Sequence, residues 1–183
     1  MIIGLTGRNA SGKGEIASYL ASKGLESHSL SDAIRDEATS RGMEHSRENL
    51  IAMGNELRQE HGPGVLGRKI AEKIKGDAVV DSIRNPSEIE ELKKLKGFTL
   101  LGVDAPIETR FERAQERGRS ENATTLDEFR EMEEKENSTD AAAQQLNACF
   151  EEADILIEND GSIKDLHTNI DKIIERLKGD ADE

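Results

Sequence analysis

The sequence predicts an α/β protein whose core is a parallel sheet of about five strands, covered by helices on both faces. Three observations support this fold class. Short apolar segments alternate with longer amphipathic ones along the chain, as strands and crossover helices do in a parallel sheet. The first apolar segment runs directly into a glycine-rich loop that opens a helix. At 183 residues, the chain has the length of a single domain with a sizeable core.

The alternation begins with an apolar strand over residues 2–5. Ile16, Ala17 and Leu20 then recur at helical spacing, and Gly24 is a typical residue for the end of that helix. Gly62, Pro63 and Gly64 interrupt the helical pattern further on. The next elements are expected as a strand at 27–31, helices at 32–41, 47–61 and 65–75, and a strand at 78–81.

The second half of the chain begins with a well-marked helix start. Asn85 is a favourable cap, Pro86 suits the first helical position, and Glu88 stands three residues after the cap. The helix that follows buries Ile89 and Leu92 on one face. The remaining elements are expected as strands at 98–103 and 154–157 and helices at 106–118, 126–135, 140–150 and 163–177.

Residues 7–13 read G-R-N-A-S-G-K, the pattern of a phosphate-binding loop. Its glycines let successive backbone N–H groups point inward at phosphate oxygens, and the following helix adds the positive end of its dipole. The alternative is an ordinary glycine-rich turn, but the preceding strand and following helix favour the loop. The residues expected to hold a nucleotide, ATP, are Gly7, Asn9, Ala10, Ser11, Gly12, Lys13, Gly14 and Glu15.

Gly14 departs from the usual form of this loop, which has Ser or Thr after the lysine. Without that hydroxyl, Mg²⁺ is expected to be held mainly by water and by the nucleotide. Glu15 is then interpreted as an acid that favours the helix dipole. The four histidines show no paired metal spacing and there is one cysteine, so no residue is predicted to bind a metal directly.

The composition limits which binding partners and which cellular compartment are expected. The net charge is −13 and the pI about 4.9, which disfavours a nucleic-acid surface. No apolar stretch approaches the ~20 residues of a membrane span, and no secretory leader is recognisable. The single cysteine, Cys149, suits a reducing compartment and is interpreted as a packing residue. We therefore expect a cytoplasmic protein, monomeric or homodimeric, that binds a small-molecule phosphate acceptor.

Charged residues follow the predicted strands, at the edge where parallel sheets bind ligands. Asp32 and Arg35 follow the second strand, and Asp81 and Arg84 follow the third. Arginine grips phosphate oxygens bidentately, and a carboxylate can orient an acceptor hydroxyl. The structural alternatives are a helix cap for Asp32, a surface ion pair for Arg35 with Asp36 or Glu37, and a turn residue for Arg84.

Another set of arginines lies on and after the helix that follows the fourth strand. Helical spacing puts Arg110, Arg113 and Arg117 on one face. A surface lattice with neighbouring glutamates is the alternative. The stretch 121–136 holds seven acids and is interpreted as a solvated face, which is compatible with a lid over residues 118–139 that excludes water.

These motifs resemble the P-loop nucleoside monophosphate kinases and the dephospho-coenzyme A kinases, over nearly the whole chain. The loop G-R-N-A-S-G-K-G is similar to the adenylate kinase form, which also has Gly after the Lys. S-L-S-D-A-I-R resembles the segment whose arginine grips the acceptor phosphate, here Arg35. V-V-D-S-I-R-N-P resembles the segment that implies Asp81 and Arg84 as substrate-binding residues, with one residue fewer between them.

The dephospho-coenzyme A kinases share other features with the chain. Asp32 matches their expected base for a ribose hydroxyl, and A-D-I-L-I-E-N-D-G resembles a loop near adenine, which implies Asn159 and Gly161 as ATP-binding residues. A set of small archaeal and bacterial kinase-like proteins shows the most similar pattern overall. The resemblance implies a three-layer kinase fold of one domain, with an acceptor-binding helical region at about 32–75.

The expected activity is transfer of the γ-phosphoryl group of ATP to a nucleoside or deoxynucleoside monophosphate. Phosphorylation of dephospho-coenzyme A is the alternative, and a P-loop ATPase, nucleotide switch or inactive nucleotide-binding module is an alternative of another class. The residues expected to act in catalysis are Lys13, Asp32, Arg84 and Arg117, with Arg113 and Arg117 also contacting ATP. Arg47–Arg68, which includes Asn55, Glu56 and Arg58, is expected to hold acceptor specificity.

Overall fold

A computed structural model of the chain describes residues 1–116, 123–137 and 139–179. Its strands form one parallel sheet in the order β2-β3-β1-β4-β5. The strands are β1 (Ile2–Gly7), β2 (Glu26–Ser29), β3 (Ala78–Asp81), β4 (Phe98–Asp104) and β5 (Ile155–Glu158). The described helices are α1 (Lys13–Ser22), α2 (Leu30–Ser40), α3 (Arg47–His61), α4 (Val65–Ala71), α5 (Pro86–Leu92), α6 (Ile107–Glu116), α7 (Leu126–Glu136), α8 (Leu146–Glu151) and α9 (Ile163–Gly179). The predicted fold class is confirmed.

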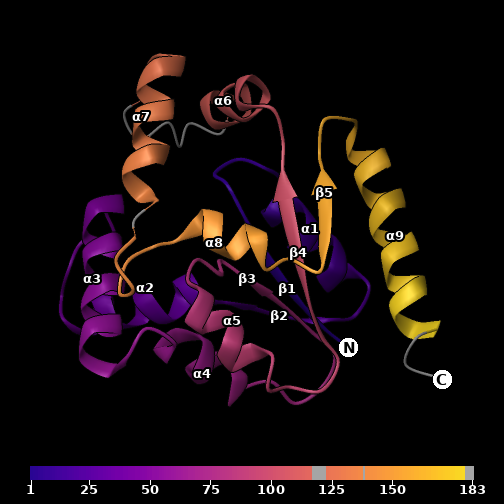
Figure 1. The fold of residues 1–183 in the computed structure, drawn as a ribbon, viewed down its shortest axis with the longest axis horizontal. Coiled ribbons are helices and arrows are strands. Elements are labelled where there is room, and N and C mark those ends of the chain that lie inside the picture. The colour runs from indigo at the N-terminus through magenta and orange to yellow at the C-terminus, as the bar shows by residue number, and fades with distance from the viewer. Residues whose placement is uncertain (117–122, 138, 180–183) are drawn as a thin grey trace.

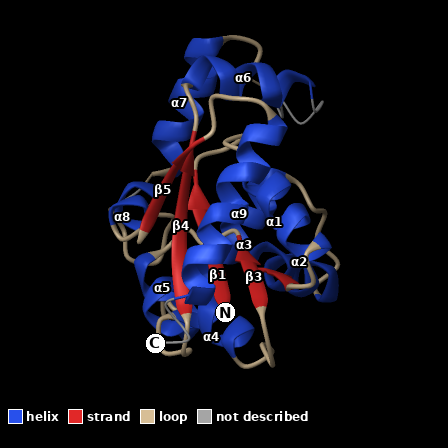
Figure 2. Cartoon of the chain, turned by 90° about the vertical axis from the view of Figure 1, so that its right-hand side faces the viewer, coloured by secondary structure: helices blue, strands red, loops and turns tan. Residues whose placement is uncertain are grey.

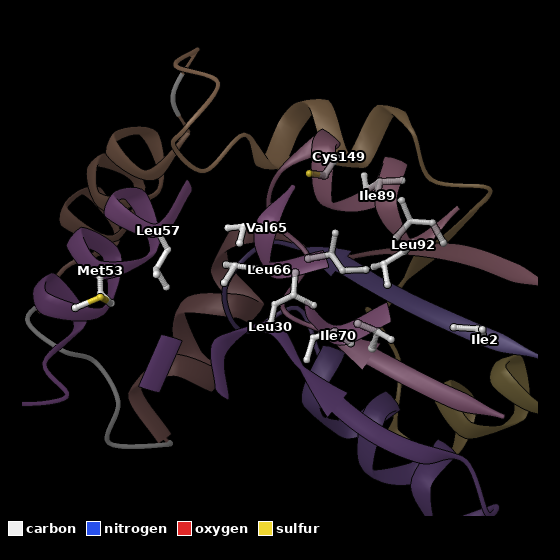
Figure 3. Packing of buried hydrophobic residues seen from close by; sticks show 13 residues of the cluster. Ile2, Leu30, Met53, Leu57, Val65, Leu66, Ile70, Ile89, Leu92 and Cys149 are labelled. Carbon is white, nitrogen blue, oxygen red and sulfur yellow. The ribbon is translucent and has the colours of Figure 1, made fainter. Parts of the chain in front are cut away.

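Helices cover both faces of the sheet (Figures 1 and 2). Alternation along β1 separates two cores, because successive side chains of a strand point to opposite faces. Ile2 packs in a cluster with residues of α3, α4, α5 and α8, and Figure 3 shows this cluster around Leu66, Ile89 and Cys149. Ile3 and Leu5 pack on the other face against α1 and α9. The two cores hold the sheet rigidly between the helical layers.

The topology brings three loops to one edge of the sheet. β1 lies in the middle, between β3 and β4, so its carboxyl end is flanked by the carboxyl ends of both neighbours. In Figure 1, α6 and α7 lie beyond the carboxyl end of β4, and α2 and α3 lie to one side of the sheet. A small third cluster joins Ala10 of the β1–α1 loop to Ala114 of α6 and Phe129 of α7. A ligand at this edge is therefore bordered by three separate parts of the chain.

Two predicted helices are shorter than expected. The helix predicted over 140–150 begins only at Leu146, because the carbonyls of Ala141 and Ala143 accept hydrogen bonds from the Asn85 side chain instead of from a helical turn. The helix predicted over 65–75 ends at Ala71. The capping box predicted at residues 85–88 is present. No described helix is long and apolar enough to cross a membrane.

Part of the predicted lid lies outside the described residues. Arg117 and residues 118–122 are in this part, so the roles predicted for Arg117 stay predictions. The helical stretch predicted within the lid is α7, which begins with a capping box at Thr125 and Glu128.

Candidate active site

The β1–α1 loop has the backbone shape that phosphate binding needs. Gly7 and Gly12 have φ of +143° and +107°, values that favour glycine. A Cβ on Gly12 would lie 2.2 Å from Asn159 Nδ2, and one on Gly7 would lie 2.0 Å from the carbonyl oxygen of Val103. Ala10 also has a positive φ of 58°. Strained backbone of this kind is typical of ligand-binding loops.

Lys13 begins α1 and folds back over the loop. Its ammonium donates hydrogen bonds to the carbonyls of Gly7 and Arg8, both at 2.7 Å. The pKa of Lys13 is lowered to about 8, mainly by burial; the charges of Arg84 and Arg110 contribute to this fall, and those of Asp81 and Asp104 oppose it. The lysine is thus a partly desolvated cation in the centre of the loop.

The loop also contains a buried polar atom without a partner. The hydroxyl oxygen of Ser11 is buried and has no hydrogen-bond partner among the described residues, which costs free energy unless a ligand supplies one. Together with the glycine geometry and Lys13, this hydroxyl makes the loop fit a nucleotide phosphate.

Asn159, predicted to contact ATP, forms a hydrogen bond with the backbone of the phosphate-binding loop. Its Nδ2 donates to the carbonyl of Ser11 at 2.9 Å, and its backbone N–H donates to the carbonyl of Asp104 at 2.8 Å. Arg113 Nη2 donates to the Asn159 carbonyl at 3.0 Å, while its buried Nη1 has no partner among the described residues. Asn159 and Arg113 therefore meet beside the loop, and Gly161 follows on the same connection.

A second rigid segment lies between β3 and α5. Ser82 adopts a positive φ of 66°, and the Thr6 hydroxyl of β1 donates to the carbonyl of Ile83 at 3.0 Å. Glu88 Oε2 accepts the backbone N–H groups of Arg84 and Asn85. The side chain of Arg84 donates to Gln144 Oε1 at 3.2 Å. The backbone that carries Arg84 is therefore fixed from two sides.

A cleft of about 320 Å³ opens between the phosphate-binding loop, α2, α3 and the segment after β3. Its lining combines basic side chains with apolar ones that include Leu50, Ile51 and Leu146. Among the described residues no carboxylate lines it. The basic residues on the cleft are Lys13, Arg35, His45, Arg47, Arg58 and Arg84. Such a cleft favours an anionic ligand beside the nucleotide loop.

Neither of the two predicted acids, Asp32 and Asp81, is among the residues that line this cleft. Asp32 is 66 % exposed and pairs with Arg35 at 2.8 Å, so Arg35 pairs with Asp32 rather than with Asp36 or Glu37. Asp81 Oδ1 accepts the N–H of Ser82 at 2.6 Å. Asp81 lies close enough to Lys13 for its charge to raise the lysine pKa. The structure therefore places Arg35 and Arg84 in the lining of the cleft, with Asp32 present only as the ion-pair partner of Arg35.

Two further predictions concern the single residues Glu15 and Cys149, and a third concerns metal ligands. Glu15 accepts a contact of 2.8 Å from His167 Nε2, and His167 stacks on Tyr19 at 3.7 Å, which ties α1 to α9. Burial raises the pKa of the Cys149 thiol to about 12, as befits a packing residue. Among the described residues no three His, Cys, Asp or Glu side chains form a group that could hold a metal.

Sequence reasoning missed some of the cleft residues. His45 lies just before α3, lines the cleft and showed no spacing signal. Arg47 begins α3 and lay in the region assigned to acceptor specificity, without a role of its own. Arg58 lay in the region assigned to specificity, but its partner Glu88 had been interpreted only as part of a helix start. Arg110 is 1 % exposed and reaches the Asn9 carbonyl and Glu133. Arg113 donates to the Asn159 carbonyl beside the same loop.

This fold, with its loop, is the P-loop kinase fold. Solved structures share it: the chain aligns with a TM-score of 0.60 and 18 % identity to the shikimate kinase of Acinetobacter baumannii in complex with shikimate, covering 97 % of this chain and 94 % of that chain. The shikimate kinase of Aquifex aeolicus aligns with a TM-score of 0.58 and 19 % identity over 99 % and 98 %. At these identities the likeness is one of fold.

Sequence comparison gives the family. Residues 3–142 match the AAA domain family. The chain is 35 % identical to the UPF0200 protein of Pyrococcus abyssi, over 97 % of both chains. It is 32 % identical to the UPF0200 protein of Hyperthermus butylicus, over 98 % of this chain and 96 % of that protein. The chain belongs to the AAA domain family and to the UPF0200 proteins.

Proposed function

We propose that this protein is an ATP-dependent kinase whose phosphoryl acceptor is a nucleoside or deoxynucleoside monophosphate. The observation that carries the proposal is the cleft beside the phosphate-binding loop, which is lined by Lys13 and four arginines and by no described carboxylate. An acceptor that is already an anion is attracted there. Its phosphate oxygen needs no base to become a nucleophile, whereas an alcohol does.

The roles of the chain's own residues follow from their positions. The loop amides and Lys13 hold the nucleotide phosphates, and Asn159 keeps the loop in shape. Arg35 and Arg84, which both line the cleft, hold the acceptor phosphate. Phosphoryl transfer requires mainly this positioning and positive charge. ATP, when bound, supplies the phosphoryl group that is transferred.

We expect Mg²⁺ at this site to be coordinated by water molecules and by nucleotide oxygens, without a direct protein ligand. Gly14 offers no hydroxyl, and Glu15 contacts His167. Asp81 and Asp104 are the acids whose charges act on Lys13, so they are the residues we expect to hold water around the ion. Magnesium, when bound, neutralises phosphate charge.

The position of Asp32 disfavours the dephospho-coenzyme A alternative. That activity needs Asp32 as a base for a hydroxyl, and Asp32 is 66 % exposed and paired with Arg35. A simple ATPase or switch gives no reason for basic residues on the cleft walls. The likeness to shikimate kinases suggests small-molecule phosphorylation in general, and shikimate, with its hydroxyl acceptor, belongs in the same test.

The test is a panel assay with ATP and Mg²⁺. Each nucleoside and deoxynucleoside monophosphate, dephospho-coenzyme A and shikimate is added separately, and ADP release is measured. We expect release to depend on a monophosphate. Equal ADP release with no acceptor would overturn the kinase proposal, and release only with an alcohol acceptor would overturn the choice of substrate class.

A further inference from the structure

Arg58 is a buried arginine that nevertheless lines the cleft. Its side chain is 2 % exposed, and its Nε and Nη2 both donate to Glu88 Oε1, at 3.0 and 2.8 Å. Its third nitrogen, Nη1, has no hydrogen-bond partner among the described residues. Glu88 therefore fixes the plane of the guanidinium, and Nη1 remains available on the side of the cleft.

Gly54 leaves space beside that nitrogen. It lies one helical turn before Arg58 in α3 and also lines the cleft. A Cβ at this position would lie 3.3 Å from Arg58 Nη1 and 3.1 Å from Ile34 Cδ1. Its backbone is ordinary helix, where alanine is more favourable than glycine. The glycine is therefore explained by the close approach of Ile34 and of Arg58 Nη1 rather than by conformation.

We propose that Arg58 is an acceptor-binding residue, whose Nη1 reaches past Gly54 to donate to an anionic oxygen of the molecule in the cleft. This inference rests on the proposed function, since it assigns that oxygen to the acceptor phosphate. Because Glu88 balances its charge, Arg58 adds a directional, charge-assisted donor rather than further net attraction. Glu88 is then a positioning residue that holds the donor at a fixed angle. Acceptors that place an anionic oxygen at Nη1 are selected over those that do not.

The test measures anion binding without turnover. The full-length protein is saturated with Mg²⁺ and a nonhydrolysable ATP analogue, so that the nucleotide loop is filled, and inorganic phosphate is titrated by calorimetry. Gly54→Ala places a methyl group beside Nη1, and Ile34 and the guanidinium must each yield slightly to admit it. We expect it to weaken phosphate binding at least tenfold, with the affinity for the analogue within twofold and a cooperative thermal transition that shows the variant is folded.

Arg58→Lys provides a second variant, because lysine keeps a charge opposite Glu88 but has no nitrogen at the Nη1 position. It should weaken phosphate binding to a similar degree. Gly76→Ala and Arg41→Lys are matched controls: the added methyl at residue 76 meets nothing within 4 Å, and Arg41 forms a surface network with Glu37 and Glu56. Both controls should bind phosphate as the wild type does.

The outcomes separate this inference from the proposed function. Unchanged phosphate affinity in Gly54→Ala and Arg58→Lys overturns the role of Arg58, as does the absence of phosphate binding to the loaded wild type. If no monophosphate in the activity panel is phosphorylated but phosphate binding still depends on Gly54, the proposed function fails and the anion contact of Arg58 stands. If a monophosphate is phosphorylated and its KM is unaffected by Gly54→Ala, the inference fails alone.

Discussion

Arg58 and Glu88 form an ion pair at 2.8 Å whose side chains are 2 % and 0 % exposed, although they lie 30 positions apart. The same carboxylate accepts the backbone N–H groups of Arg84 and Asn85. One side chain thus joins α3, the start of α5 and the segment that carries Arg84. A buried charge of this kind is costly when its partner is removed.

Glu88→Ala should therefore destabilise the protein strongly. The substitution leaves Arg58 buried without a counter-charge and two backbone donors without an acceptor, and the expected loss in the free energy of unfolding is about 3–5 kcal/mol. Urea denaturation followed by circular dichroism measures this loss. Glu91→Ala, which removes an acid from the partly exposed pair with Lys94, is the control and should barely move the midpoint. Equal midpoints for the two variants would contradict the importance of the buried pair.

Arg84→Ala should separate acceptor binding from ATP binding. Arg84 lines the cleft and donates to Gln144, and its charge acts on Lys13 at the nucleotide loop. We expect the KM for the acceptor to rise or kcat to fall, roughly tenfold or more for the loss of a charge-assisted contact, with the Kd for ATP little changed. Steady-state kinetics and ATP titration measure these effects. A variant that loses ATP affinity and acceptor affinity equally would place Arg84 at the nucleotide instead.

Much of the fold follows from local patterns in the sequence. The strand–loop–helix that contains Lys13 was predictable because the loop sequence demands its own backbone shape. The capping box at Asn85 and Glu88 was predictable because its signal lies within four residues. The alternation of strands and helices then determined a parallel sheet, although not the lengths of helices such as 140–150. That helix is shortened by a contact with Asn85, far away in the sequence.

Residues of the site could be predicted only where a local sequence motif contains them. Arg35 and Arg84 follow strands, and their place at the sheet edge was inferred from that alone. The ion pair of Arg58 with Glu88 joins residues of separate helices, so no spacing rule reveals it. Similarly, no local pattern indicates that the Asp32 carboxylate pairs with Arg35 and stays largely exposed. Side-chain direction and long-range pairing depend on packing, which a single sequence does not encode in a local pattern.

Asn159→Ala should weaken nucleotide binding without unfolding the protein. The substitution removes the hydrogen bond from Nδ2 to the Ser11 carbonyl, so the loop is less well ordered before ligand arrives. A hydrogen bond of this kind contributes about 0.5–1.5 kcal/mol, which corresponds to a Kd for ATP raised roughly two- to tenfold. Isothermal titration checks the Kd, and Asn147→Ala on the exposed face of α8 is the control. An unchanged Kd in Asn159→Ala would show that the loop keeps its shape unaided.

Nucleotide binding should take up a proton at alkaline pH through Lys13. Burial lowers the pKa of this lysine to about 8, and a bound phosphate, being an anion, raises it again. Affinity is therefore full below pH 8 and falls as the pH rises above 8 toward the pKa of the bound state, by up to tenfold per unit for one proton. Calorimetry at pH 8.5 in two buffers of different ionisation enthalpy measures the uptake. Lys13→Arg should abolish it because arginine stays charged, whereas Lys23→Met, at the exposed end of α1, should leave it unchanged. Equal proton uptake in wild type and Lys13→Arg would assign the proton to another group.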